Sequence, residues 1–205
     1  MTPPKQLVLA SNNQGKLSEF QALFDNTHLN IQLIPQGKLG IADADETGLS
    51  FVENAIIKAR HASKLSGLPA IADDSGLCVP VLGNAPGIYS ARFAGSHGDD
   101  RANNDKLLQE LKNFRGTTPI IGQFICVLAL VRHKDDPLPI IAQGHWTGEI
   151  LDTPQGDHGF GYDPLFYLPS LAKTSAELDK ATKNRLSHRG QALQTLLNVL
   201  INTDI

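Results

Sequence analysis

The amino-acid sequence predicts an α/β fold in which helices pack on a mixed β-sheet, with two lobes around a cleft. Short apolar runs typical of strands alternate with amphipathic stretches typical of helices. One run, residues 120–132, is apolar on both faces, as a central strand requires. The sequence contains no internal repeat and no low-complexity linker, so we expect one domain over residues 1–205, with two lobes and no separable linker.

The N-terminal part predicts a strand, a loop and a helix in that order. Residues 7–10 form a short apolar run, and residues 11–15 are suited to a turn and a helix cap before Lys16 begins a new pattern. The following apolar side chains lie on one face of a helix: Leu17, Phe20, Leu23 and Phe24.

A second helix is marked by its ends. Ser50 and Glu53 have the spacing of a capping box, and Gly67 and Pro69 end the helix. Its apolar face consists of Val52, Ala55, Ile56 and Ala59.

A short strand over residues 70–72 follows this helix. Asp73 and Asp74 come directly after it, so we expect the acidic pair at the carboxyl end of a strand. Residues 78–82 are expected to be extended again.

The C-terminal half predicts two more helices and a strand pair. Asp99 or Asp100 can cap the first of these helices. Residues 138–146 return after a turn as an antiparallel partner of the central strand. Ser187 can cap the last helix, whose apolar face is Leu193, Leu196, Leu197, Leu200 and Ile201.

The charge and cysteine content exclude several classes of protein. Eighteen Lys and Arg against 21 Asp and Glu give a formal net charge of −3, so no global positive field favours nucleic acid or an anionic membrane. No apolar run is long enough to span a bilayer, and the N-terminus lacks the pattern of a signal peptide. Cys78 and Cys126 lack metal-ligand spacing and are expected to be buried free thiols. Together these features predict a cytoplasmic protein.

The loop before the first helix is a candidate phosphate site. Backbone N–H groups at a helix N-terminus, small polar donors and one cation suit an anion, although a simple capped turn has the same sequence. The residues are Ser11, Asn12, Asn13, Gln14, Gly15 and Lys16.

Two acidic segments are candidate metal ligands. Asp73 and Asp74 are adjacent, and a separate loop contains Asp43, Asp45 and Glu46. Mg²⁺ usually takes one or two carboxylates together with substrate phosphates, and a neighbouring carboxylate can accept a proton. Solvated acidic turns are the alternative interpretation.

Two later segments could bind an aromatic base and an anion. Residues 159–164 combine flexible glycines with two aromatic side chains and a carboxylate, which can stack on a base and hydrogen-bond its edge. An ordinary loop with Phe160 in the core is the alternative. Cations and hydrogen-bond donors gather before and at the start of the last helix, where surface charge and helix capping would explain them equally well. They are Lys183, Ser187, His188 and Arg189.

Taken together and in order, these segments resemble the inosine/xanthosine triphosphate pyrophosphatases over about residues 7–197. Ser11 replaces the commoner threonine but keeps the hydroxyl. The matching motifs are Ser11-x-Asn13-x-x-Lys16, Glu46-Thr47-Gly48 with Phe51-x-Glu53-Asn54-Ala55-x-x-Lys58-Ala59, Asp73-Asp74-Ser75-Gly76-Leu77, Pro86-Gly87-x-x-Ser90-Ala91-Arg92, Phe160-Gly161-Tyr162-Asp163-Pro164 and Ser187-His188-Arg189-Gly190.

The resemblance implies an α/β fold of two lobes on a long central mixed β-sheet with flanking helices, and a homodimer. It further implies that the protein uses Mg²⁺ to hydrolyse dITP, ITP and XTP to monophosphate and pyrophosphate. It implies that Asp74 accepts a proton and binds metal, with Glu46, or its neighbour Asp45, as the second ligand. The residues implied for phosphates and sugar are Ser11, Asn12, Asn13, Gln14, Gly15, Lys16, Ser75 and Lys183. Those implied for the base are Phe160, Gly161, Tyr162, Asp163, His188 and Arg189.

Two other functions fit parts of the sequence. A Maf-like nucleotide pyrophosphatase of different base specificity shares a similar opening motif, but it should lack the Ser-His-Arg segment at residues 187–189. A nucleotide-binding sensor without turnover would keep the pocket but would not need Asp74, Glu46 and Lys16 intact.

Overall fold

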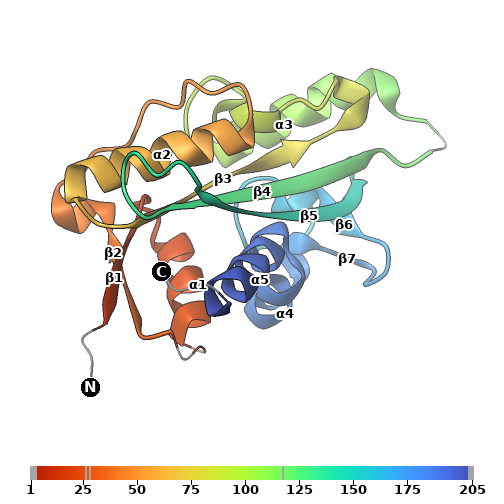
Figure 1. The fold of residues 1–205 in the computed structure, drawn as a ribbon. Helices are drawn as coiled ribbons and strands as arrows, with labels where there is room; N and C mark the ends of the chain where they lie inside the picture. Colours follow the sequence, from red (N-terminus) through yellow and green to blue (C-terminus); the bar gives the residue numbers. More distant parts are fainter. Residues whose placement is uncertain (1–3, 26, 28, 117, 203–205) are drawn as a thin grey trace. The chain divides into compact units, whose positions relative to one another are not determined.

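Within residues 4–25, 27, 29–116 and 118–202, which the computed structural model describes, seven strands form one sheet in the order β2-β1-β3-β4-β5-β6-β7 (Figure 1). The strands are β1 (Lys5–Leu9), β2 (Ile31–Pro35), β3 (Ala70–Cys78), β4 (Ile121–Val131), β5 (Ile140–Ile150), β6 (Phe166–Leu168) and β7 (Lys173–Thr174). The helices are α1 (Gln14–Asp25), α2 (Phe51–Ser66), α3 (Asp100–Leu111), α4 (Lys180–Leu186) and α5 (His188–Ile201). Parallel pairs β1–β2 and β1–β3 and antiparallel pairs β5–β6 and β6–β7 confirm the mixed sheet and the α/β class.

The chain divides into two compact units. The first consists of residues 1–74, 126–144 and 191–205, and the second of residues 75–125 and 145–190. Each unit has its own cluster of buried apolar side chains. The boundary falls inside β3, so the segments predicted to carry chemistry are distributed over both units.

The first unit packs helices on parallel strands. In Figure 1, α1 and α5 lie on one face of its strands and α2 lies on the other. The core under α1 and α5 includes Leu9, Phe20, Leu128, Leu193 and Leu196, each almost completely buried. The predicted apolar faces of α1 and α5 therefore pack on the sheet as expected, except that Ile201 is 61% exposed. The side chain of Leu23 lies outside the described part of the structure.

The predicted helix ends are confirmed for α2 and α3. The Ser50 hydroxyl accepts a hydrogen bond from the Glu53 N–H, and Gly67 at the other end of α2 has a φ of 71°. Asp99 caps α3 by accepting from the Ala102 N–H, which leaves Asp100 as the first helical residue.

The second unit has a core rich in aromatic side chains. Phe166 lies between Phe124 and Trp146, with ring centroids 4.6 Å and 5.3 Å away. α3 contributes Leu107 and Leu111, which are fully buried. This packing fixes α3 in the second unit through its apolar side and leaves its polar side for other contacts.

The acidic pair lies inside a strand and not at its end. β3 continues through Asp73 and Asp74 to Cys78, so the predicted terminus is wrong. Both carboxylates have lysine partners, described below, and such partners allow charge inside a buried strand without any local sequence signal. Residues 80–82 form a short 3-10 turn around Pro80 and are not extended, contrary to the sequence prediction.

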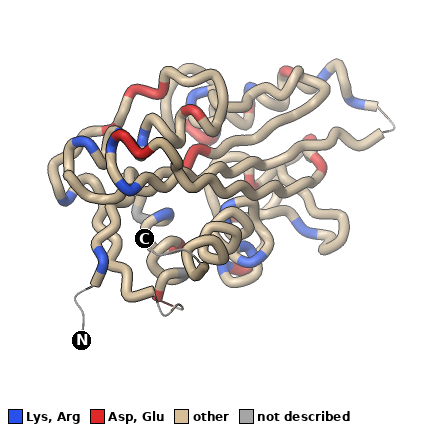
Figure 2. Tube along the Cα trace, viewed as in Figure 1, with Lys and Arg blue, Asp and Glu red and all other residues tan. Residues whose placement is uncertain are grey.

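The structure can be compared with the sequence predictions about membrane spans, charge and cysteines. None of the helices in the described residues is long and apolar enough to cross a membrane. Figure 2 shows basic and acidic residues interspersed along the trace. Cys78 and Cys126 are free thiols; Cys126 is buried as expected, whereas Cys78 is only partly buried.

Candidate functional site

The loop between β1 and α1 is a capped helix N-terminus. The Asn13 side chain accepts a hydrogen bond from the Lys16 N–H at 3.0 Å, and the Ser11 hydroxyl accepts from the Asn13 N–H at 3.2 Å. Asn12, Asn13 and Gly15 are exposed, which leaves the helix N-terminus accessible to an anion. The side chain of Gln14 lies outside the described part of the structure.

Lys16 forms an ion pair with Asp73. Its Nζ lies 3.0 Å and 2.9 Å from the two carboxylate oxygens of Asp73, whose side chain is almost completely buried. A buried carboxylate without a partner would be costly, so this pair explains why β3 tolerates Asp73. Asp73 therefore positions the cation of the candidate phosphate loop.

Lys58 of α2 joins the two predicted metal ligands. Its Nζ lies 2.7 Å from Glu46 Oε1 and 2.8 Å from Asp74 Oδ1. Burial by itself would lower the pKa of Lys58, but attraction to Asp74 and Asp73 outweighs it and raises the pKa to about 12. Lys58 is therefore a fixed positive charge between the two carboxylates.

Asp74 has a raised pKa. Burial is the main cause, and repulsion from Glu46 and Asp73 adds to it, whereas Lys58 opposes the shift. A carboxylate of raised pKa that stays ionised is a better proton acceptor than a solvent-exposed one. This electrostatic setting suits Asp74 as a general base.

Asn54 connects the acidic loop to Asp74, a contact for which the sequence analysis assigned no role. Its side-chain oxygen accepts the Gly48 N–H at 2.8 Å, and its amide nitrogen lies 3.5 Å from Asp74 Oδ2. Asn54 is fully buried, and Lys58 follows one helical turn later on the same face of α2. The i, i+4 spacing in α2 was the signal that could have revealed this pair.

The remaining acids of this loop differ in their surroundings. Asp43 Oδ1 accepts hydrogen bonds from the side chains of Asn12 and Gln36, which ties the acidic loop to the candidate phosphate loop. Asp45 is exposed, whereas Glu46 accepts a hydrogen bond from Lys58, which also donates to Asp74. This geometry favours Glu46 over Asp45 as the partner of Asp74.

The donor set fits a hard divalent cation whose other ligands come from substrate. Among the described residues, no group of three or more His, Cys, Asp or Glu side chains is placed to hold a metal ion. Glu46 and Asp74 supply two carboxylates, the number that a cation completed by phosphate oxygens and water takes from protein.

In the second unit, Asp163 organises the glycine-rich segment. Its carboxylate pairs with Lys183 and accepts hydrogen bonds from the Phe160 N–H and the Ser175 hydroxyl, both at 2.8 Å. Gly159 has a φ of 83°, and a Cβ there would collide with Asp163. Asp163 itself is buried, so the segment is held by a satisfied internal charge.

The two aromatic side chains of this segment have different surroundings. Phe160 is 48% exposed, so the interpretation that it belongs to the core is wrong. Lys183 Nζ and Arg189 Cζ lie 5.1 Å and 5.7 Å from its ring centroid. Tyr162 is buried in the core and donates its hydroxyl proton to the Ser90 carbonyl at 2.9 Å, and burial raises its pKa. Phe160 is therefore the aromatic side chain that a base could reach.

The start of α5 completes this second group. The His188 ring stacks on Phe124 at 4.8 Å between centroids, and Arg189 Nη2 lies 3.4 Å from Ser75 Oγ. The Ser187 hydroxyl accepts the Gly190 N–H at 3.2 Å, which confirms the predicted cap. The structure thus brings Ser75, Phe160, Asp163, Lys183 and Arg189 together within the second unit.

Comparison with known proteins gives a family match over most of the chain. The profile of the Ham1 family matches residues 7–199. A dITP/XTP pyrophosphatase from Acinetobacter baumannii (strain ATCC 17978) is 65% identical over 196 residues, which cover 95% of each chain. The structure of a HAM1 protein from Coxiella burnetii is 48% identical, covers 97% of this chain and 100% of its own, and has a TM-score of 0.91. The Staphylococcus aureus Ham1 protein is 42% identical, with a TM-score of 0.86 and coverage of 97% and 99%.

Proposed function

The chain belongs to the Ham1 family, and from this premise we propose that it hydrolyses dITP, ITP, XTP and dXTP to nucleoside monophosphate and pyrophosphate. Removing these deaminated purine nucleotides from the pool prevents their incorporation into DNA and RNA. The observation that carries the proposal is the buried carboxylate of Asp74, joined to Glu46 through Lys58 and raised in pKa.

Asp74 is the proposed general base. It takes a proton from the water that attacks the α-phosphorus, and the bond from this phosphorus to the oxygen bridging the β-phosphorus breaks. Pyrophosphate then leaves, and no covalent nucleophile is needed. The raised pKa of Asp74 favours this proton transfer, while Lys58 opposes the rise in pKa and holds the carboxylate in place.

Mg²⁺ is the proposed cofactor, held by Glu46 and Asp74 and by phosphate oxygens of the substrate. When bound, it neutralises charge that develops on the phosphate oxygens. The chain's own contribution is the pair of carboxylates at the acidic loop and β3, together with the ammonium groups of Lys16 and Lys58.

The phosphates and sugar are assigned to the residues that the family resemblance implies for them. The N-terminus of α1 offers backbone N–H groups and the Lys16 cation, and Ser75 and Lys183 add a hydroxyl and a second cation. The residues proposed for this role are Ser11, Asn12, Asn13, Gln14, Gly15, Lys16, Ser75 and Lys183.

Base recognition is assigned to the segment of Phe160, Gly161, Tyr162 and Asp163 together with His188 and Arg189. Within the segment, the buried Tyr162 and Asp163 support the backbone and do not contact the base directly. Phe160 offers an exposed ring for stacking. The backbone N–H groups of Phe160 and Gly161 already donate to Asp163 and Asp100, so we assign the 6-keto oxygen of the base to His188 and Arg189. The 6-amino group of adenine would face these donors with another donor, and hydrogen-bonding groups that would then lack a partner can support discrimination of up to ~10⁴.

The alternative functions are less well supported. The family match over residues 7–199 and the Ser187-His188-Arg189 segment favour a Ham1 enzyme over a Maf-like pyrophosphatase. The intact pair of Glu46 and Asp74, with its bridging lysine, favours turnover over a sensor that only binds nucleotide.

The proposal also covers the domain organisation, the cellular location and the partners of the protein. Neither unit is one continuous stretch of chain, which supports two lobes of a single pyrophosphatase domain over residues 1–205. Two free thiols and a nucleotide substrate are consistent with the cytoplasm. No nucleic acid or membrane partner is proposed, because the net charge of −3 favours neither.

Product analysis with a panel of nucleotides tests the function. With Mg²⁺, we expect ITP, dITP and XTP to yield monophosphate and pyrophosphate, with kcat/KM far above the values for ATP, GTP and pyrimidine triphosphates. The 2′-hydroxyl should have little effect, and excess chelator should abolish turnover. Release of orthophosphate as the primary product, or equal cleavage of ATP and ITP, would contradict the proposal.

Replacing Asp74 by Asn should lower kcat for ITP by ~10²-fold or more, because one change removes a proton acceptor and a metal ligand. The matched variant Asp73→Asn removes a neighbouring charge that holds Lys16, and it should raise KM more than it lowers kcat. Steady-state kinetics on folded protein measure both. Near-wild-type turnover by a folded Asp74→Asn variant would exclude Asp74 as the base.

We further propose that the chain forms a homodimer, as the family resemblance implies. Tyr89 in the second unit is about half exposed (53%), which leaves an aromatic side chain for such a contact. Sedimentation velocity should give a mass near twice 22.1 kDa at micromolar concentration. A monomer at every concentration tested would reject the dimer.

A further inference from the structure

We propose that Asp100 and Asn104 of α3 are positioning residues that fix the segment at residues 159–163 and thereby set the affinity for the base. This inference rests on the proposed function, because it assigns base binding to that segment. Neither residue belongs to a motif that the sequence connects with the base. The sequence predicts only that Asp100 can cap a helix.

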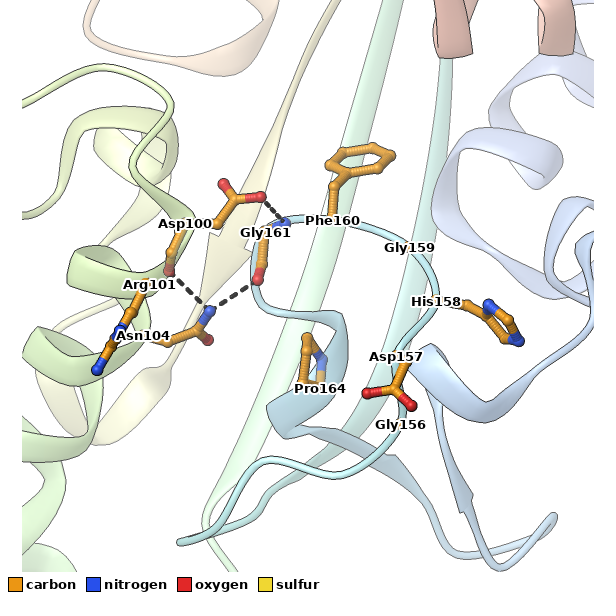
Figure 3. A pocket seen from close by; sticks show the side chains of 10 residues that line it. All are labelled: Asp100, Arg101, Asn104, Gly156, Asp157, His158, Gly159, Phe160, Gly161 and Pro164. Atoms are coloured by element: carbon orange, nitrogen blue, oxygen red, sulfur yellow. Dashed lines mark hydrogen bonds between the residues drawn. The ribbon is translucent and has the colours of Figure 1, made fainter.

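Both polar backbone groups of Gly161 are held by this one helix. Asp100 Oδ2 accepts the Gly161 N–H at 2.7 Å, and Asn104 Nδ2 donates to the Gly161 carbonyl at 2.8 Å (Figure 3). Asp100 and Asn104 are one helical turn apart and therefore lie on the same face of α3. Two hydrogen bonds to one residue fix the orientation of the adjoining peptide units, which a single bond would not.

This attachment acts directly beside Phe160. The Phe160 N–H is bound by Asp163, so two successive residues of the segment are anchored by two different carboxylates. The Phe160 ring itself is 48% exposed and projects from the segment away from Pro164 in Figure 3. The backbone contacts therefore help to hold in place a half-exposed ring, which Lys183 and Arg189 also contact. A ring fixed before binding loses less conformational freedom when a base stacks on it.

The hydrogen bonds from α3 hold Gly161, whereas the next residue, Tyr162, is held by burial in the apolar core. A hollow of about 320 Å³ lies beside Gly161, lined by Asp100, Arg101 and Asn104 on the helix and by residues 156–161 and Pro164 (Figure 3). Loss of the two polar side chains would therefore loosen the segment at Gly161 without emptying an apolar core.

The role of Asp100 can be separated from the stability of α3. Asp99, and not Asp100, provides the N-cap, and Leu107 and Leu111 bury the apolar side of the helix. Substitutions at Asp100 and Asn104 therefore leave the cap and the buried face intact.

Kinetics of four variants test the proposal. We expect Asp100→Ala and Asn104→Ala each to raise KM for ITP about tenfold, the effect of one lost hydrogen bond to a positioned group, while kcat stays within about twofold. Asp100→Asn should restore most of the affinity, because its amide oxygen can accept the Gly161 N–H. Asp105→Ala, an exposed position on the same helix, is the matched control and should change neither constant.

Inhibition by inorganic pyrophosphate separates positioning from general damage, because pyrophosphate has no base. Its inhibition constant should stay unchanged in the variants. If KM, kcat and the pyrophosphate constant all worsen together, or if Asp100→Ala and Asn104→Ala leave KM unchanged, the proposal is overturned. If Asp100→Ala does not fold, Asn104→Ala decides.

Hydrogen exchange measured by mass spectrometry on a peptide covering residues 156–163 gives a readout that needs no substrate. The exchange should become faster in Asp100→Ala and Asn104→Ala and stay as in the wild type in Asp105→Ala. Unchanged exchange in both Ala variants would overturn the positioning role. If the wild-type protein does not cleave ITP, the proposed function fails on its own, and the exchange result still decides whether α3 fixes the segment.

Discussion

Three carboxylates of the first unit are held by two ammonium groups, and the candidate chemistry depends on this balance. Lys16 pairs with Asp73, and Lys58 pairs with both Glu46 and Asp74. Charges that are largely withdrawn from water need such partners, because desolvation costs several kcal/mol per ion. Three negative and two positive charges leave an excess of negative charge, which favours a divalent cation at the Glu46–Asp74 pair.

The second unit uses the same principle for a different purpose. Asp163 is buried and satisfied by Lys183, the Ser175 hydroxyl and a backbone N–H, and it fixes a backbone segment instead of a reacting group. The proposed general base and the proposed base-binding segment are therefore held by separate networks, the first around Lys58 and the second around Asp163. Changes at Lys58 and Asp74 should lower kcat, whereas changes around Asp163 should raise KM.

Much of the fold could be predicted because its signals are local. The helix cap at Ser50 and the two-faced apolar run of β4 depend on spacing within one element, and both are confirmed. The strands β2, β6 and β7 and the short helix α4 were not anticipated. β6 and β7 are very short, and what holds them in the sheet is pairing with distant residues.

The site shows the same division between local and distant effects. The sequence identified the carboxylates and lysines, but the continuation of β3 through Asp73 and Asp74 depends on Lys16 and Lys58, which come from other elements. The burial of Tyr162 and the exposure of Phe160 likewise follow from the left-handed glycines around them and from the Ser90 carbonyl. The most direct test of the central claim is titration calorimetry of metal-free protein with Mg²⁺, with and without a non-hydrolysable ITP analogue. If Glu46 and Asp74, which both pair with Lys58, need substrate phosphates to complete the metal site, the analogue should tighten Mg²⁺ binding by about tenfold or more. Equal Mg²⁺ affinity with and without the analogue would contradict the account.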